Sequence, residues 1–155
     1  AGVSLAHLHS TENRMSHPQA HAGTPAERGQ STSIDLAAKM ALIHEQWQPR
    51  VVAEMNDYQF KVVKVQGEFP WHRHAGTDEA FFVLEGELRI DMRGGPAGDE
   101  TIVLRAGQLA VVPKGVEHRP SASAEVKLML IEPRGVLNTG DGARSARSAE
   151  NDLWI

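Results

Sequence analysis

Four side chains that could share one metal ion stand in two short segments of the sequence: His72, His74 and Glu79 in the first, and His118 in the second. On an extended strand alternate side chains point to the same face, so His72 and His74 can present their imidazoles to one ion. A turn after His74 would reverse the chain and allow Glu79 to return a carboxylate to that ion. His118 follows a turn-forming Pro-Lys-Gly sequence, which can set a later strand beside the first pair.

The chemistry of this ligand set narrows the choice of metal. Three imidazole nitrogens and one carboxylate oxygen suit one divalent transition metal per chain, which could be Fe, Mn, Ni, Zn or Cu. The chain contains no cysteine, which excludes a disulfide framework, a thiolate nucleophile and a cysteine-ligated zinc site. The alternative interpretation is a barrel without metal, in which these histidines are hydrogen-bonding groups of the core.

The elements that must position these residues are short strands. After Pro49 the sequence consists of segments rich in Val, Ile, Leu and Phe, separated by Gly and Pro, which is typical of antiparallel strands and turns. In the clearest case Leu88, Ile90 and Met92 alternate with charged residues. About nine such segments with few helical patterns favour a sandwich or a small barrel. They are 51–55, 59–66, 71–74, 79–84, 87–92, 101–104, 109–112, 117–120 and 126–132.

The segments before the barrel have a different character. Residues 1–32 predict a poorly ordered arm, because few large apolar groups offset the entropy of ordering them. We interpret His7 and His9 as part of this tail rather than as a metal site. Residues 33–49 predict a helix that begins at an N-capping Ser33 and ends at Pro49. Its apolar stripe repeats at spacings of four, three and four: Leu36, Met40, Ile43 and Trp47.

The predicted barrel occupies residues 50–133, and residues 134–155 form an extension. We expect this extension to pack on the barrel or on a partner, anchored by Trp154 near its end. Phe81 and Phe82 are adjacent on one strand, so one ring must face away from the barrel interior. Pairing of two copies through that outer sheet face would cover it, which predicts a homodimer.

The two ligand segments resemble the paired signature motifs of the cupin superfamily of small β-barrels. In the first motif, four residues separate the His-x-His pair from Glu79, and six more separate Glu79 from Gly86, as in the family. Gly67 departs slightly from the family spacing, since four residues rather than five separate it from His72.

The second motif also matches at most of its positions. Gly107, Pro113, Gly115 and His118 follow the family pattern, and Ala122 stands where the family has asparagine. That asparagine is not usually a metal ligand in the family, so the change bears on local strand geometry more than on the metal.

The resemblance covers about residues 51–132 and implies an all-β fold, a single jelly-roll barrel whose four ligand residues bind a divalent metal near its open end. Such sites keep one or two coordination positions for water or substrate. Because Glu79 faces inward, strand phase predicts that Phe81 and Val83 line the pocket with it. Val111 is the expected neighbour on the strand of the second motif.

Length and composition exclude several other classes. A chain of 155 residues supports one domain, and 41% hydrophobic with 23% charged residues is close to the globular average. A formal charge of −4 argues against a nucleic-acid partner. The apolar runs are far shorter than the roughly 20 residues needed to cross a bilayer, so no membrane span is expected. The first residues lack the pattern of a secretory leader, and we expect a cytoplasmic location.

Two classes of function fit these features. The first is a metal-dependent enzyme acting on a small organic molecule, with oxygenase, isomerase and lyase chemistry all open. The alternative is a non-catalytic module that binds or senses a small molecule. A sensor usually carries a DNA-binding domain, and the one predicted helix lacks a basic face that could supply it.

Overall fold

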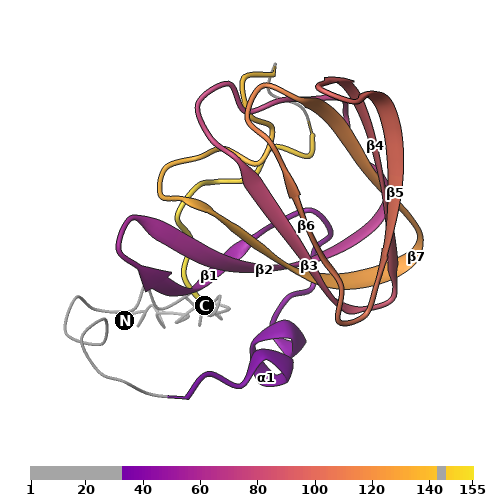
Figure 1. Cartoon of the computed structure of the whole chain (residues 1–155). Coiled ribbons are helices and arrows are strands. Elements are labelled where there is room, and N and C mark those ends of the chain that lie inside the picture. Colours follow the sequence, from indigo (N-terminus) through magenta and orange to yellow (C-terminus); the bar gives the residue numbers. More distant parts are fainter. Residues whose placement is uncertain (1–32, 143–145) are drawn as a thin grey trace, which may run out of the picture.

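The structure, a computed structural model, describes residues 33–142 and 146–155. The predicted arm 1–32, with His7 and His9, lies outside the described residues. In the described part, seven antiparallel strands roll into a barrel-like sheet with one short helix below it (Figure 1). The all-β prediction is confirmed. The strands are β1 (Arg50–Met55), β2 (Tyr58–Glu68), β3 (Glu79–Glu85), β4 (Glu87–Gly95), β5 (Gly98–Arg105), β6 (Leu109–Val112) and β7 (Glu117–Pro133).

Strand β7 organises the sheet. The strands pair in the order β1-β2-β7-β3-β6, and β4 joins β7 to β5. The first part of β7 pairs with β4, and its later part runs between β2 and β3. The sequence predicted two strands here, 117–120 and 126–132, but β7 is one strand of 17 residues. The strand continues because Ser121 pairs with Arg89 and Ala122 pairs with Gly67.

Two apolar clusters lie on opposite faces of the sheet. The larger cluster fills the inside of the roll and includes Val63, Val83, Leu88 and Leu128. Burial of side chains of this kind contributes about 1.5–3 kcal/mol each, which makes this cluster the main source of stability. The smaller cluster lies between the outer face of the sheet and the helical region, and its buried members are Met40, Ile43, Val52, Val62 and Met129.

The helix α1 (Leu36–Ala41) is shorter than predicted. Its N-cap is Asp35, whose carboxylate accepts a hydrogen bond from the backbone N–H of Ala38, and not Ser33. The chain leaves the helix after Leu42, and the residues that follow form hydrogen bonds with Lys64 of β2. Its ammonium donates to the carbonyl of Ile43, and its own carbonyl accepts from the N–H of Trp47. The prediction of a helix over 33–49 is therefore wrong beyond its first turns.

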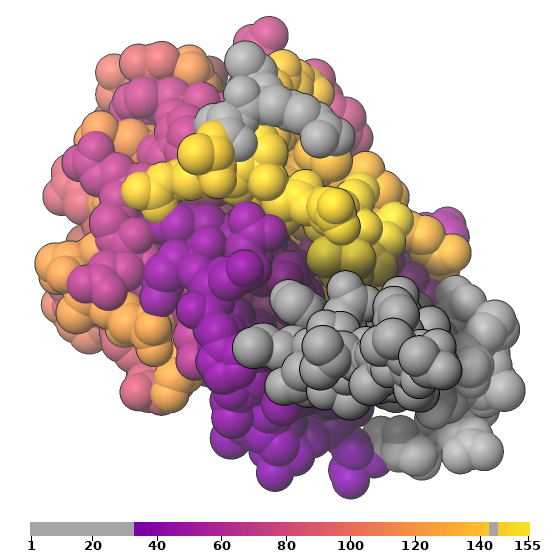
Figure 2. Space-filling view, turned by 180° about the vertical axis from the view of Figure 1, so that it is seen from behind, coloured from indigo at the N-terminus to yellow at the C-terminus, as the bar shows by residue number. Residues whose placement is uncertain are grey.

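The C-terminal segment runs back across the barrel. In Figure 2 it is a yellow band over the indigo surface of the first elements. The N–H of Val51 donates to the carbonyl of Leu153, and the N–H of Ile155 donates to the carbonyl of Val51. Trp154 forms a parallel bridge with Val51. This segment therefore acts as an additional edge beside β1.

Gly140 lets the same segment approach the His72–His74 region closely. Its backbone has a φ of +53°, and a Cβ there would lie 2.1 Å from the carbonyl oxygen of Arg73. Such a separation is impossible for real atoms, so any side chain at this position must displace the segment.

Gly140→Ala is therefore expected to lower the free energy of unfolding by more than the roughly 1–2 kcal/mol that a left-handed backbone alone costs a non-glycine residue. The matched control is Gly107→Ala, because Gly107 has a φ of +83° with open space around it. Urea denaturation of both variants would measure the difference. Equal losses in the two variants would show that the contact with Arg73 is unimportant.

No helix in the described ranges is long and apolar enough to cross a membrane. The cytoplasmic location stays a prediction.

Candidate metal centre

The structure brings the four predicted ligand residues together inside the barrel. Ligand atoms of His72, His74, Glu79 and His118 all lie within 4.8 Å of one another, and all four residues are buried. Nε2 of His74 lies 3.2 Å and Nε2 of His118 3.1 Å from the same oxygen, Oε2 of Glu79. An ion bonded at about 2.0–2.2 Å to each ligand holds its ligand atoms up to about 4.4 Å apart. A small inward movement would therefore close the group around a cation.

The segment that carries the first two histidines is held from both sides. His72 and His118 exchange two backbone hydrogen bonds of 3.1 and 2.8 Å, and on the other side the N–H of Asp141 donates to the carbonyl of Arg73. This geometry turns His72 and His74 inward and Arg73 outward. The predicted strand at 71–74 is wrong, because the segment forms only one isolated bridge and its second neighbour is the C-terminal segment.

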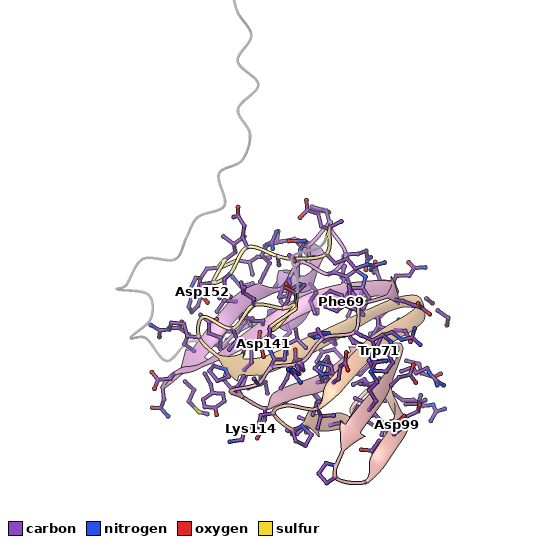
Figure 3. The ribbon with its side chains drawn as sticks, turned by 90° about the horizontal axis from the view of Figure 1, so that it is seen from above. Phe69, Trp71, Asp99, Lys114, Asp141 and Asp152 are labelled. Carbon is purple, nitrogen blue, oxygen red and sulfur yellow. The ribbon has the colours of Figure 1, made fainter. Side chains whose placement is uncertain are left out.

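Glu79 enters the site as the first residue of β3. The turn before it is tied to the turn before His118, since the carboxylate of Asp78 accepts a 2.8 Å hydrogen bond from the N–H of Lys114. The N–H of Gly115 also donates to the carbonyl of His74. Figure 3 looks down on this end of the barrel, with Lys114 and Asp141 labelled. The two motifs are thus joined through their backbones as well as through their ligand atoms.

The hydrogen bonds of the rings fit a bound cation. Nδ1 of His72 lies 3.0 Å from the carbonyl oxygen of Pro70, and Nδ1 of His118 lies 3.1 Å from that of Val116. A proton on each Nδ1 leaves the lone pair of Nε2 free for a metal, as is usual for metal-binding histidines. Nε2 of His74 is buried and faces the same carboxylate oxygen, Oε2 of Glu79, at 3.2 Å. A divalent metal would satisfy these atoms, so the residues fit the group.

The electrostatics of the site favour a neutral His72 and an ionised Glu79, whereas at His74 the contact with Glu79 outweighs burial and raises the pKa. Burial, together with the neighbouring His118, lowers the pKa of His72 to about 4. Burial alone would raise the pKa of Glu79, but its contacts with His118 and His74 hold that pKa well below its usual range. Unprotonated nitrogen and ionised oxygen are the forms that bind metal.

Comparison with known proteins agrees with this geometry. Residues 59–132 match the cupin domain family. A cupin-2 domain containing protein of Shewanella frigidimarina is 55% identical, over 65% of this chain and 94% of its own, with a TM-score of 0.61. The uncharacterised protein YdbB of Bacillus subtilis is 37% identical over 81 residues, which are 52% of this chain and 68% of YdbB.

The chain belongs to the cupin superfamily. A more distant fold neighbour is hydroquinone 1,2-dioxygenase of Sphingomonas, crystallised with 4-hydroxybenzoate bound. It is 17% identical, covers 63% of this cupin and 72% of its own chain, and has a TM-score of 0.55. At that identity the likeness shows the fold alone.

A small pocket adjoins the metal centre of this cupin, and both His72 and Glu79 border it. The sequence did not predict several of the residues that line this pocket. Trp47 comes from the segment predicted as helix, and Phe69 from the loop after β2. Phe69 lies an even number of residues after Val63 and Val65, which point inward. This alternation could have identified Phe69 as an inward-facing residue.

The three predicted lining residues occupy three different environments in the structure. Phe81 borders the pocket, whereas Val83 lies deeper in the apolar core of the barrel. The prediction for Val111 is wrong, because its side chain points outward and is 51% exposed. On β6 it is Val112 that pairs with Glu79, and Val112 is the buried residue.

A second charged group of this cupin, which was not among the predicted site residues, lies near the metal centre. Lys61 of β2 and Glu132 of β7 form a 2.9 Å ion pair with almost no exposure to solvent. The register in which Ala80 pairs with Ile131 sets Glu132 beside Glu79. The second oxygen of Glu132 is buried without a hydrogen-bond partner among the described residues. Burial and the charge of Glu79 raise the pKa of Glu132 to about 7 in spite of Lys61.

This raised pKa predicts how stability depends on pH. Between the ordinary value of 4.5 and about 7, the folded protein keeps a proton on Glu132 that the unfolded chain releases. The resulting stabilisation is fully present below 4.5 and is lost as the pH rises through 7. Glu132→Gln should remove this loss.

Urea unfolding at pH 5, 6, 7 and 8 in the presence of a chelator would measure the effect. The control is Glu85→Gln, because Glu85 pairs with Lys127 on the surface. Wild type should lose more stability between pH 5 and 8 than Glu132→Gln, and Glu85→Gln should follow wild type. If wild type and Glu132→Gln lose the same stability between pH 5 and 8, the raised pKa of Glu132 is contradicted.

Proposed function

We propose that this cupin is a divalent-metal-dependent enzyme acting on a small organic molecule. One observation carries the proposal. Two of the four ligand residues, His72 and Glu79, also border a pocket with mainly apolar walls. A molecule in that pocket would therefore lie against the metal centre, which is the arrangement that catalysis requires.

Each part of the site has a defined task in this proposal. His72, His74, Glu79 and His118 would hold one transition metal, which when bound could polarise a carbonyl, activate water or bind oxygen. Phe69 and the other apolar walls exclude water and strengthen charge interactions at the centre. The carbonyls of Pro70 and Val116 orient two of the imidazole rings.

Oxygen uptake is the assay that tests the proposal first, because a fold neighbour carries the name of a dioxygenase. Protein loaded with Fe(II) without air would be mixed with a panel of small phenols, aldehydes and ketones. Turnover that is absent in His118→Ala supports an enzyme, and iron with oxygen uptake indicates an oxygenase. Turnover with zinc and without uptake indicates an isomerase or lyase. Binding with no turnover under any of these conditions would overturn the proposal in favour of a binding module.

We also propose that two copies of this cupin associate through the outer face of β6. Leu109 and Val111 are 52% and 51% exposed there, and β6 is an edge strand of the sheet. Leu109 pairs with Phe82, so the three side chains form one apolar surface. Light scattering after gel filtration should give a dimer mass for wild type and a monomer mass for Leu109→Glu. A monomer mass for wild type would contradict the proposal.

A further inference from the structure

The pocket beside the metal centre has almost no polar groups to offer a ligand. Among the described residues that line it, only Asn138 and Trp47 carry polar side-chain groups besides the two ligands. Both are already occupied. The amide nitrogen of Asn138 donates to the carbonyls of Trp47 and Arg147, and its oxygen accepts from the N–H of Ala149. The indole N–H of Trp47 donates to the carbonyl of Gln66.

The apolar walls are aromatic next to the ligands. The rings of Phe69 and His72 have centroids 5.0 Å apart and meet edge to face. The rings of Trp47 and Phe69 follow, with centroids 4.8 Å apart. A row of three rings therefore leads from a metal ligand along one wall of the pocket. Rings attract one another in such offset and edge contacts beyond the area that they bury.

These two features restrict what the pocket can accept. A polar head group can be satisfied at the metal centre, but a second polar group on the same molecule would lose its water without a partner. That loss weakens binding for a neutral group and weakens it more for a carboxylate. A dicarboxylate, a sugar or an amino acid is therefore a poor fit.

We propose that the substrate is a small, single-ring aromatic molecule with one oxygen-bearing head group, such as a phenol or an aromatic aldehyde. This inference rests on the proposed function, since the head group is placed at the metal. Phe69 is the specificity-determining residue, because its ring lies between His72 and Trp47.

A matched pair of ligands tests the inference. 4-Methylphenol and 4-hydroxybenzoate are similar in shape and differ in the second polar group. Isothermal titration of Zn(II)-loaded protein should give a Kd for 4-methylphenol at least tenfold lower than for 4-hydroxybenzoate, and succinate should bind more weakly still. Equal affinities, a reversed order or no binding of 4-methylphenol would overturn the inference.

Variants on the two sides of the same segment sharpen the test. Phe69→Leu should weaken 4-methylphenol at least threefold while metal content stays unchanged. Trp71→Ala is the control, because Trp71 packs under the guanidinium of Arg93 and does not line the pocket. An equal loss in both variants would contradict the role of Phe69.

The titration separates this inference from the proposed function. Elemental analysis of the same sample reports whether the metal is bound. Protein that holds one metal but shows no preference refutes only the substrate class. Protein that takes up no metal refutes the proposed function, and the same titration without metal then still tests the pocket through its preference between the two ligands.

Discussion

Replacing His72 and His74 together by alanine is expected to reduce the bound metal from about one ion per chain to less than about a tenth of an ion. The variant keeps only Glu79 and His118 of the four ligand residues. Two protein ligands do not hold a transition metal against dilution and washing, because tight sites use three or four. Elemental analysis after gel filtration measures the change.

A matched variant controls for the general effect of losing a histidine. His44→Ala removes an exposed histidine on the segment after α1, far in sequence from the ligands. It should leave the metal content unchanged. Circular dichroism would show that the double variant is folded. Full metal content in a folded double variant would mean that the metal is held elsewhere.

Lys61→Met is expected to destabilise the protein by about 3–5 kcal/mol at pH 8. The methionine fills similar space, but Glu132 is left as a buried carboxylate without its counter-ion. Because the pKa of Glu132 is already raised to about 7, the carboxylate can take up a proton at low pH. The loss should therefore be smaller at pH 5. Urea unfolding at both pH values would measure it.

Two further variants make this expectation specific. Lys61→Met combined with Glu132→Leu removes both charges and should recover most of the lost stability, since an apolar pair often replaces a buried ion pair without cost. Lys127→Met breaks a 2.7 Å pair with Glu85 on the surface and should cost less than about 1 kcal/mol. A small effect of Lys61→Met at both pH values would show that the buried pair contributes little.

The ligand residues could be predicted because a short pattern determines them. Alternation sets His72 and His74 on one face even though their segment is not a regular strand. The turns before Glu79 and His118 were also recognisable, and they join through Asp78. The local sequence pattern was therefore sufficient to predict the four ligand residues.

The pocket and the helix could not be predicted in the same way. The apolar stripe that ends at Trp47 has helical spacing, yet long-range hydrogen bonds from Lys64 replace the helix there. Val111 was assigned to the interior because the phase of β6 was unknown until its pairing with β3 was seen. In both places the local conformation depends on contacts with residues far away in the chain, which the sequence pattern does not reveal.

The buried ion pair also has a recognisable pattern in the sequence. Lys61 lies in the same strand phase as Val63 and Val65, and Glu132 in the same phase as Leu128. A charge in the inward phase of a strand must find a partner inside, because an unpaired buried charge is costly. Two such charges on separate strands predict that they pair, although the sequence does not show that β2 and β7 are neighbours.

Metal content of the wild-type protein tests the central claim most directly. Protein purified without added chelator would be analysed for all first-row transition metals, and its melting temperature would be measured before and after Zn(II) is added to chelator-treated protein. We predict about one metal ion per chain and a rise in melting temperature with Zn(II), because an ion that binds only the folded state stabilises it. Protein without metal, whose melting temperature does not respond to Zn(II), Fe(II) or Mn(II), would contradict the account.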